Sequence, residues 1–290
     1  MPLESIGRLM HEARRNSYAV GYFESWNLES LQGVIDAAEE TRSPVIIGFN
    51  GEFLSQRAGA RVEELAMYGT MGIAAAAQAY VPCGLIFNEC SNDSWVEYAM
   101  TVGFNLVMPA DPHARFDDYA RRVKGLTTKA HARQVAVEAE IDELPCGDEH
   151  GSKSDPEVAA QFVTATGVDL LAISVGNEHI KLEGRAPLDL ARLEAVCKHV
   201  DVPLVLHGGS GIEDDSLKSA IRLGIRKVNY GTYIKQRFLP AVRDALSRDE
   251  HNPHAVLGNG SSTDVVVIGR KVVRDAVLER IEVLGCCGKA

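Results

Sequence analysis

The chain alternates between short apolar runs and longer amphipathic segments along nearly its whole length. Each short run is of strand length, and each longer segment has the apolar spacing of a helix. The eight predicted strands span residues 19–22, 43–48, 83–87, 105–108, 134–138, 169–175, 203–206 and 226–229. Strands that alternate with helices pair in parallel, and eight such units predict a closed (β/α)8 barrel, the TIM barrel.

The segments between these strands supply the predicted helices. They span residues 28–41, 61–79, 94–102, 114–126, 155–166, 188–200, 214–223 and a segment that begins at Thr232. A last helix over 265–283 predicts a C-terminal helical extension. The stretch after the first strand lacks the glycine-rich turn of an open dinucleotide-binding sheet. No linker interrupts the pattern, so residues 1–290 are predicted to form a single TIM-barrel domain.

Charge and composition exclude several classes of function. The formal net charge of −10 argues against nucleic acid and anionic membranes as partners, because both need basic surfaces. No apolar run approaches the ~20 residues that span a bilayer, and the first residues do not resemble a signal peptide. The six cysteines contain no Cys-x-x-Cys pair, which is typical of reduced thiols. We therefore expect a cytoplasmic protein. An acidic chain can still bind a phosphorylated metabolite through backbone amides.

Polar side chains gather where the predicted strands end. In a (β/α)8 barrel this end carries the functional residues. These polar residues are Glu24, Asn27, Asn50, Glu52, Asn88, Glu89, Glu138, Glu140, His179, His207, Asn229 and Thr232.

Two histidines and one carboxylate among them suggest a metal site. His179 follows the sixth strand, His207 ends the seventh, and Glu89 ends the third. A single histidine after a buried strand is more often structural, but two of them with a carboxylate on a third strand favour metal binding. Such a ligand set suits zinc, manganese, iron or cobalt and leaves positions open for substrate.

Two glycine-rich turns and one loop complete the predicted functional face. The turns at 208–211 and 229–232 are rich in glycine and precede helices, so their backbone amides are suited to a phosphate group. Glycine also permits tight turns without any ligand. The polar stretch at 143–156 follows the fifth strand and suits a mobile active-site flap. A second polar stretch, at 247–263, separates the barrel from the last helix.

Several of these segments resemble the class II, metal-dependent ketose-bisphosphate aldolases, the fructose- and tagatose-bisphosphate aldolases. The most specific is Val-Pro-Leu-Val-Leu-His-Gly-Gly-Ser-Gly at 202–211. Residues 18–23, 137–140, 166–172 and 284–290 extend the resemblance over nearly the whole chain. In that family a divalent cation, usually zinc, polarises the substrate carbonyl and stabilises an enediolate. The resemblance also implies a homodimer or homotetramer.

The resemblance assigns roles residue by residue. His179 and His207 match two of three metal-binding histidines. Asp148 falls in the loop that holds a proton-transferring base, and Glu140 falls where the family has a carboxylate near the metal. The residues predicted to bind the sugar or sugar phosphate are Asn27, Lys181, Gly208, Gly209, Ser210, Asn229, Gly231 and Thr232. Zinc is the first expectation for the metal, with manganese, iron, cobalt and magnesium as alternatives.

The resemblance breaks at the third strand. An ungapped register puts Asn88 on the family's proton-transferring Asp and Glu89 on its third metal-binding His. Asparagine has no titratable proton, and glutamate adds a negative charge that weakens the metal as a Lewis acid. A shift by one residue would instead put Glu89 on the acid and Cys90 on the ligand.

Two further positions depart from the family. Glu24 stands where the family has an asparagine near the substrate, and Ile180 replaces a glycine of the phosphate site, for which Lys181 would compensate. These changes argue against ordinary fructose-bisphosphate aldolase activity. They predict a divergent carbon–carbon lyase that acts on a phosphorylated or acidic ketose. Glu24, Glu140 and Asp148 are candidates to move the proton. An epimerase, isomerase or decarboxylase that uses the same enediolate, and a non-catalytic sugar-phosphate-binding paralogue, are the alternatives.

Overall fold

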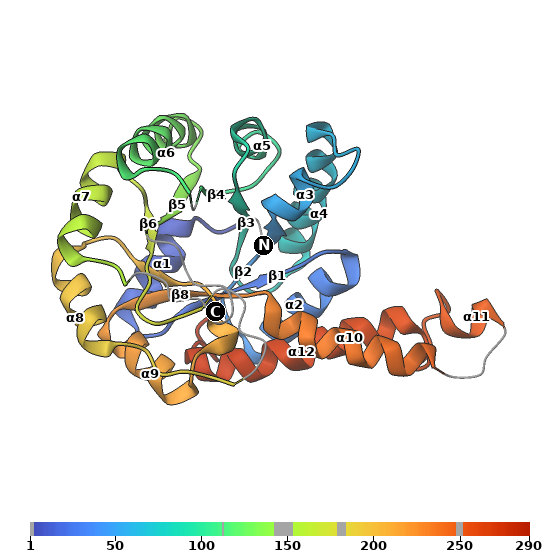
Figure 1. The fold of residues 1–290 in the computed structure, drawn as a ribbon. Coiled ribbons are helices and arrows are strands. Elements are labelled where there is room, and N and C mark those ends of the chain that lie inside the picture. Colours follow the sequence, from blue (N-terminus) through green and yellow to red (C-terminus); the bar gives the residue numbers. More distant parts are fainter. Residues whose placement is uncertain (1–2, 112, 142–152, 179–183, 248–251) are drawn as a thin grey trace.

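Eight parallel strands form a closed barrel in which each strand pairs with its neighbours in chain order (Figure 1). The computed structural model describes residues 3–111, 113–141, 153–178, 184–247 and 252–290. The strands are β1 (Val20–Glu24), β2 (Val45–Asn50), β3 (Cys83–Cys90), β4 (Leu106–Pro109), β5 (Ala136–Glu140), β6 (Leu170–Ala172), β7 (Leu204–Leu206) and β8 (Ile225–Tyr230). The predicted TIM barrel is therefore confirmed.

The helices form a layer around the outside of the barrel (Figure 1). They are α1 (Ile6–Arg15), α2 (Leu28–Thr41), α3 (Gly51–Ser55), α4 (Leu65–Gln78), α5 (Asp93–Ala99), α6 (Phe116–His131), α7 (Pro156–Thr166), α8 (Leu190–His199), α9 (Asp214–Leu223), α10 (Thr232–Leu246), α11 (Pro253–Val256) and α12 (Val265–Leu284). Two short 3-10 helices, η1 (Val62–Glu64) and η2 (Gly209–Gly211), complete the set. The sequence pattern did not predict α1, α3 or α11.

Side-chain caps fix where several of the helices begin. Asn27 accepts a hydrogen bond from the Ser30 amide, and the Ser30 hydroxyl accepts one from the Asn27 amide, which is a capping box. Asp155 caps α7, whose first residue, Pro156, lacks the amide that would otherwise be unsatisfied. These caps explain why helices at 28–41 and 155–166 could be predicted almost to the residue.

The sixth strand is shorter than the predicted span of 169–175. The amide of Ser174 donates to the Ser154 hydroxyl, and that of Val175 donates to the Asn177 side chain, rather than continuing the sheet. Residues 173–175 are buried and mostly apolar, so composition alone makes them look like strand. The strand therefore ends at Ala172 rather than at the predicted residue 175.

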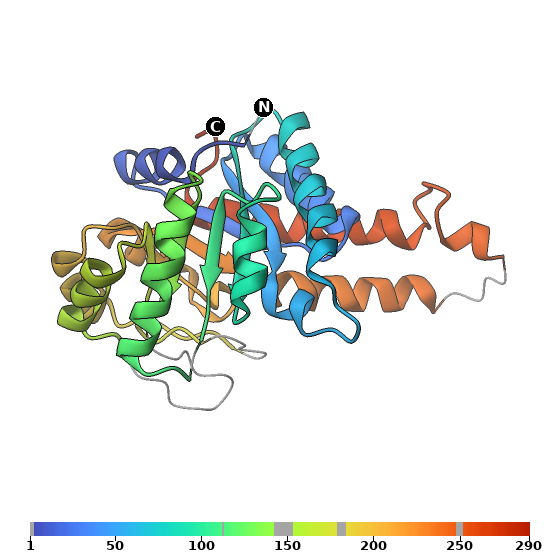
Figure 2. The same cartoon turned by 90° about the horizontal axis from the view of Figure 1, so that it is seen from above.

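The predicted C-terminal helical extension is present, and it pairs with α10. Helices α10 and α12 run side by side away from the barrel, with α11 at their far end (Figures 1 and 2). At its other end α12 packs against α2, and the Ala19 amide donates to the carbonyl of Leu284. Within the stretch 247–263, expected to be a simple loop, α11 forms. Among the described residues, no helix has the length and apolar character needed to cross a membrane.

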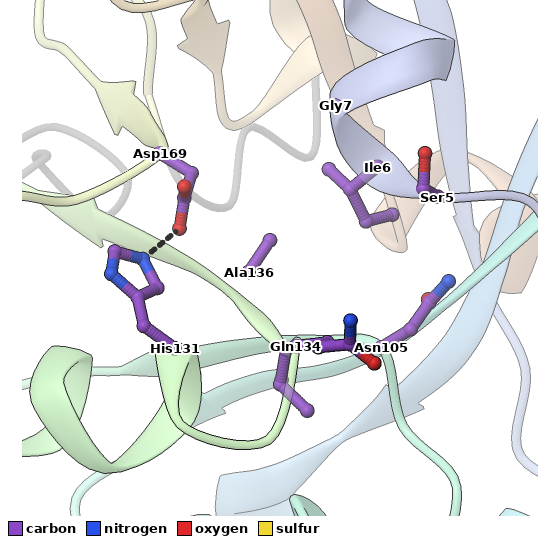
Figure 3. Close-up of a pocket in the computed structure, with 9 residues that line it drawn as sticks. Ser5, Ile6, Gly7, Asn105, His131, Gln134, Ala136 and Asp169 are labelled. Carbon is purple, nitrogen blue, oxygen red and sulfur yellow. Dashed lines mark hydrogen bonds and ion pairs between the residues drawn. The ribbon is translucent and has the colours of Figure 1, made fainter.

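A surface hollow of about 330 Å³ lies at the amino ends of β4, β5 and β6 (Figure 3). His131 hydrogen-bonds Asp169 there at 2.9 Å, and Asp169 also accepts from the amide of Val137. Asn105 connects the amide of Leu85 to the carbonyl of Glu4. These contacts join neighbouring elements at the end of the barrel that faces away from the polar strand ends, so we assign this hollow to stability.

Candidate active site

The imidazole of His207 is the centre of the polar cluster at the carboxyl ends of the strands. It follows β7 and is 1% exposed. Its Nε2 lies 3.0 Å from Oε1 of Glu138, and its Nδ1 lies 3.1 Å from Oε1 of Glu89 and 3.9 Å from Oε1 of Glu140. Three carboxylates from β3 and β5 therefore surround one imidazole.

An irregularity in β3 turns Glu89 toward this imidazole. The pairing of β3 with β4 shifts between Phe87 and Cys90, and Glu89 has a φ of 52°. A left-handed backbone is uncommon for a residue with a Cβ and occurs at functional turns. The Asn50 side chain donates to Oε2 of Glu89 at 2.9 Å and holds the carboxylate.

The thiol of Cys90 faces elsewhere. It lies 3.6 Å from the carbonyl oxygen of Asn92 and 3.9 Å from the Ser55 hydroxyl, and burial raises its pKa to about 11. A buried thiol with a raised pKa is a poor metal ligand, because the thiolate is the form that binds. The geometry therefore favours Glu89 over Cys90 as the residue that acts beside His207.

The backbone around His207 is held from two sides. The Asn177 side chain donates to the carbonyl of His207 at 3.1 Å and to that of Ile173. Gly208 follows with a φ of 64°, a conformation that glycine adopts without strain. The backbone that carries the imidazole is therefore held by the Asn177 side chain on one side and by the turn at Gly208 on the other.

Charge around the imidazole is strongly coupled. Burial alone would lower the pKa of His207, but Glu140, Glu138 and Glu89 raise it to about 10. Burial would raise the pKa of Glu138, but Lys227, whose Nζ lies 2.7 Å from Oε2, and His207 hold it below its ordinary value. The imidazole is thus a cation among carboxylates when no metal is bound.

The residues present fit a divalent cation. An imidazole nitrogen and the carboxylates of Glu89 and Glu140 converge, and these are the donors that zinc and similar metals take. A divalent cation would replace the proton as the positive charge among them. The described part of the chain contains no group of three or more His, Cys, Asp or Glu side chains arranged as a ready metal site. The second expected ligand, His179, lies outside the described residues, as do Asp148 and Lys181.

The two glycine turns lie against each other. The hydroxyl of Ser210, in η2, accepts a hydrogen bond of 2.9 Å from the Tyr233 amide in the first turn of α10. Gly209 has no room for a side chain, because a Cβ there would lie 2.7 Å from the Tyr230 and Val228 side chains. Gly231 and Thr232 lead directly into α10. The turns therefore bring backbone amides and a helix N-terminus to one place, as a phosphate group requires.

An ion pair that the sequence did not predict lies beside the second glycine turn. Nζ of Lys235, on α10, lies 2.5 Å from Oε1 of Glu24 and 4.5 Å from the centre of the Phe53 ring. A Cβ on Gly231 would overlap Oε2 of Glu24. A lysine in the first turn of the helix that follows the second glycine turn was the available signal.

Two of the asparagines expected at the mouth, Asn88 and Asn229, lie together, whereas Asn27 does not join them. Nδ2 of Asn229 lies 3.5 Å from Oδ1 of Asn88, and both side chains are buried. The Asn27 side chain caps α2 through its contact with Ser30. Sequence reasoning also missed Lys227, which it treated only as part of the strand at 226–229.

Comparison with known proteins identifies the family of the chain. The family model described as fructose-bisphosphate aldolase class-II matches residues 4–289. The chain is 32% identical over 300 residues to the fructose-bisphosphate aldolase of Geobacillus stearothermophilus, covering 100% of this chain and 99% of that protein. It is 34% identical over 289 residues to the uncharacterized protein YdjI of Escherichia coli K12, covering 97% and 96%.

A solved structure has the same fold. The crystal structure of the YdjI aldolase from Escherichia coli K12 superposes with a TM-score of 0.83 at 34% identity, covering 99% of both chains. The match to the family model and the identity to these relatives extend over nearly the full length of the chain. The chain belongs to the class-II fructose-bisphosphate aldolase family.

Proposed function

We propose that this protein is a divergent class II aldolase, a metal-dependent carbon–carbon lyase that acts on a phosphorylated or acidic ketose. Glu89, His179 and His207 would hold the metal. The observation that carries the proposal is the contact of 3.1 Å between Glu89 and His207. It supports Glu89 as the residue that takes the place of the family's third metal-binding histidine.

The metal would be zinc first, with manganese, iron, cobalt or magnesium as alternatives. When bound, a divalent cation polarises the substrate carbonyl and stabilises the negative charge that develops on its oxygen. Glu89 contributes a negative charge that a histidine would not, so we expect the ligand set to favour a substrate that is easily enolised. Glu140, 3.9 Å from His207, adds further negative charge at the same place.

The phosphate or acidic group of the substrate would bind at the two glycine turns. Backbone amides from 208–210 and 231–232 and the Ser210 hydroxyl would be the donors there, as helix N-termini usually provide for phosphate. Lys235 supplies a positive side chain beside Gly231, and Lys181 stays a predicted second one. Asn229 would donate to a substrate hydroxyl, whereas the contacts of Asn27 support a role in capping α2.

Proton transfer must come from a carboxylate, because Asn88 can neither give nor take a proton. Glu24, Glu140 and Asp148 are the proposed residues. Cleavage requires a base that removes a proton from the hydroxyl next to the breaking bond, and then an acid that protonates the carbon left behind. Glu140 is near His207, and Glu24 is near the phosphate turns. A ketose whose carbonyl lies near His207 and whose phosphate lies at the glycine turns would have Glu140 near one end and Glu24 near the other.

The buried Asn88–Asn229 contact also favours a second candidate function. An epimerase or isomerase needs proton exchange next to the carbonyl but no acid at a cleaved hydroxyl, and a decarboxylase likewise needs none. A paralogue that only binds a sugar phosphate would keep the phosphate turns without turnover. Release of a short carbonyl fragment from a ketose would distinguish the lyase from each of these.

We further propose that the protein assembles into a homodimer or homotetramer. The extension formed by α10, α11 and α12 exposes Leu239, Leu246 and Leu257, and solvent-exposed leucines on a projecting arm are typical of an interface. Light scattering after size exclusion should give twice or four times the chain mass, and Leu246→Lys should lower it. The cytoplasmic location and the single domain over 1–290 stay predictions from the sequence.

The proposed function is tested by measuring metal and proton exchange in the same samples. Bound metal is determined by elemental analysis in the wild type, Glu89→Ala and His207→Ala, and hydrogen exchange is followed on dihydroxyacetone phosphate. We expect both variants to lose most of the metal and the exchange. Glu97→Ala is the matched control, because Glu97 is an exposed carboxylate on α5 whose partner is Lys129. A wild type that holds no metal and exchanges no proton would refute the lyase.

A further inference from the structure

Lys227 is a fully buried cation inside the barrel, and the proposed chemistry does not use it directly. It lies on β8, and its Nζ is 2.7 Å from Oε2 of Glu138 and 2.5 Å from Oδ1 of Asn229. The Tyr22 ring lies beneath it, with its centre 5.3 Å away. A lysine ammonium group has only donors, so the Asn229 oxygen accepts from it, and Oε2 of Glu138 is its ion-pair partner.

Lys227 is connected to His207 through Glu138, and this connection fixes which ring nitrogen of His207 donates. Glu138 receives Lys227 at one oxygen and faces Nε2 of His207 with the other at 3.0 Å. An ionised carboxylate can only accept, so Nε2 of His207 must carry the hydrogen. The other ring nitrogen, Nδ1, is then the atom turned toward Glu89. A carboxylate that orients the ring of a metal-binding histidine in this way is a common arrangement.

Lys227 is also connected to Asn88 through Asn229, and this connection fixes how both side-chain amides are oriented. Since the oxygen of the Asn229 amide faces Lys227, its NH2 group faces the site and approaches Oδ1 of Asn88 at 3.5 Å. The oxygen of Asn88 is therefore on the side of Asn229, and its own NH2 group is left for the opposite side. One buried lysine thus settles which atoms donate on both halves of the site.

We propose that Lys227 is a positioning residue that sets the hydrogen-bond direction of His207 on the metal side and of Asn229 and Asn88 on the substrate side. The inference rests on the proposed function, which makes His207 a metal ligand. The simpler explanation is that Lys227 only neutralises the charge of buried Glu138. The two explanations differ in what happens when Lys227 and the charge of Glu138 are removed together.

The test uses Lys227→Met, Lys227→Met/Glu138→Gln and Arg226→Met. The glutamine of the double variant has no charge but can still accept from His207 through its oxygen, so no unpaired buried charge remains. Arg226 is the matched control, because it is a buried cation on the same strand that donates to the carbonyls of Ile221 and Ile225, away from the site. Zinc affinity is measured by competition with a chromophoric chelator. The approach of the Asn229 NH2 group to the oxygen of Asn88 is followed by nuclear Overhauser effects from the Asn229 NH2 protons to the side-chain protons of Asn88 in metal-free protein.

We expect Lys227→Met to weaken zinc binding by at least about tenfold, the usual effect of losing a partner of a metal ligand, and to abolish the Asn229–Asn88 contact. The double variant should recover zinc affinity to within about threefold while the contact stays lost. Arg226→Met should lower thermal stability and change neither readout. If Lys227→Met does not fold, the double variant carries both measurements.

Three results would overturn the inference. They are wild-type zinc affinity in Lys227→Met, a retained Asn229–Asn88 contact in either variant without Lys227, and loss of that contact in Arg226→Met. A wild-type protein that binds none of zinc, manganese, iron, cobalt and magnesium would instead contradict the proposed function. The Asn229–Asn88 contact is recorded without metal, so it would still decide whether Lys227 orients the substrate side.

Discussion

Glu89 and His207 meet across the mouth of the barrel. Glu89 is on β3 and His207 follows β7, which are opposite strands of the eight, yet their side chains approach to 3.1 Å. Side chains from opposite strands touch only where both point to the barrel axis. The left-handed backbone at Glu89 and the shift in the β3–β4 pairing provide this direction on one side. Because the two side chains are in contact, substitutions at Glu89 should change the environment of His207.

Glu89→Gln should weaken metal binding without unfolding the protein. The change removes one negative charge and keeps the shape of the side chain, including the oxygen that accepts from Asn50. We expect zinc affinity to fall at least about tenfold, which corresponds to about 1.4 kcal/mol. Chelator competition measures the affinity. Glu52→Gln is the control, because Glu52 bonds Ser91 at the same rim. Equal affinities in the two variants would remove Glu89 from the ligand set.

Metal-free protein should lose stability as the pH rises from about 7 to 10. The pKa of His207 is raised from 6.5 to about 10 by Glu140, Glu138 and Glu89, against the effect of burial. A raised folded-state pKa gives stability that is fully present below the unfolded pKa and is lost as pH rises through the folded one. Urea unfolding in the presence of a chelator should therefore show a steeper alkaline loss in the wild type than in His207→Gln.

The comparison with His207→Gln is needed because other groups act at alkaline pH. Burial raises the pKa of the Cys83 and Cys286 thiols to about 12, so unfolding is favoured there as these thiols ionise in the unfolded chain. That loss is common to both proteins. If the two stability curves run parallel between pH values of about 7 and 10, His207 is not held as a cation in the folded state.

The fold could be predicted because each element carries a local signal. The helix at 28–41 has both helical spacing and the Asn27 cap, and its bounds match the structure. The amphipathic segment that forms α1 was missed because it precedes the first strand and has no place in the strand–helix alternation. The end of β6 was missed because the amides after it bond to Ser154 and Asn177, partners that apolar composition does not reveal.

The candidate site could be predicted only where polar residues end strands. Glu89 and His207 were expected in one site on that ground, and the structure places them in contact. Lys227 lies within a strand, and its partner Glu138 is on another strand that the chain reaches much earlier. A lysine within the short segment Arg-Lys-Val-Asn at 226–229 gives no sign that it points into the barrel, because the face of a strand depends on pairing. The place of Lys235 in the site likewise depends on its ion pair with Glu24, which the sequence does not reveal.

Gly209→Ala should destabilise the protein. A methyl group there would lie 2.7 Å from the Tyr230 and Val228 side chains and 3.0 Å from the Asn229 carbonyl, so the turn must shift. Overpacking of this kind costs about 1–3 kcal/mol. The matched control is Gly125→Ala in α6, where a methyl group would meet no atom within 4 Å and alanine should stabilise the helix by about 0.5–1 kcal/mol. Chemical denaturation measures both, and a neutral Gly209→Ala would show that the turn tolerates a side chain.

Lys235→Met and Glu24→Gln should change phosphate recognition in opposite directions. The ammonium group of Lys235 is 2.5 Å from Glu24 beside Gly231, so it is the described cation at the second glycine turn, and Glu24 competes with a phosphate for it. A charge-assisted hydrogen bond contributes about 1.5–3 kcal/mol, and the partial exposure of Lys235 favours the lower end. Lys235→Met should therefore weaken binding of dihydroxyacetone phosphate about tenfold, while Glu24→Gln should strengthen it.

Calorimetry measures both effects, with dihydroxyacetone as the unphosphorylated comparison. Arg237→Met is the control, because Arg237 lies on the same helix and pairs with Glu279. Weaker binding in both variants would indicate that the ion pair shapes the turn rather than competing for the phosphate.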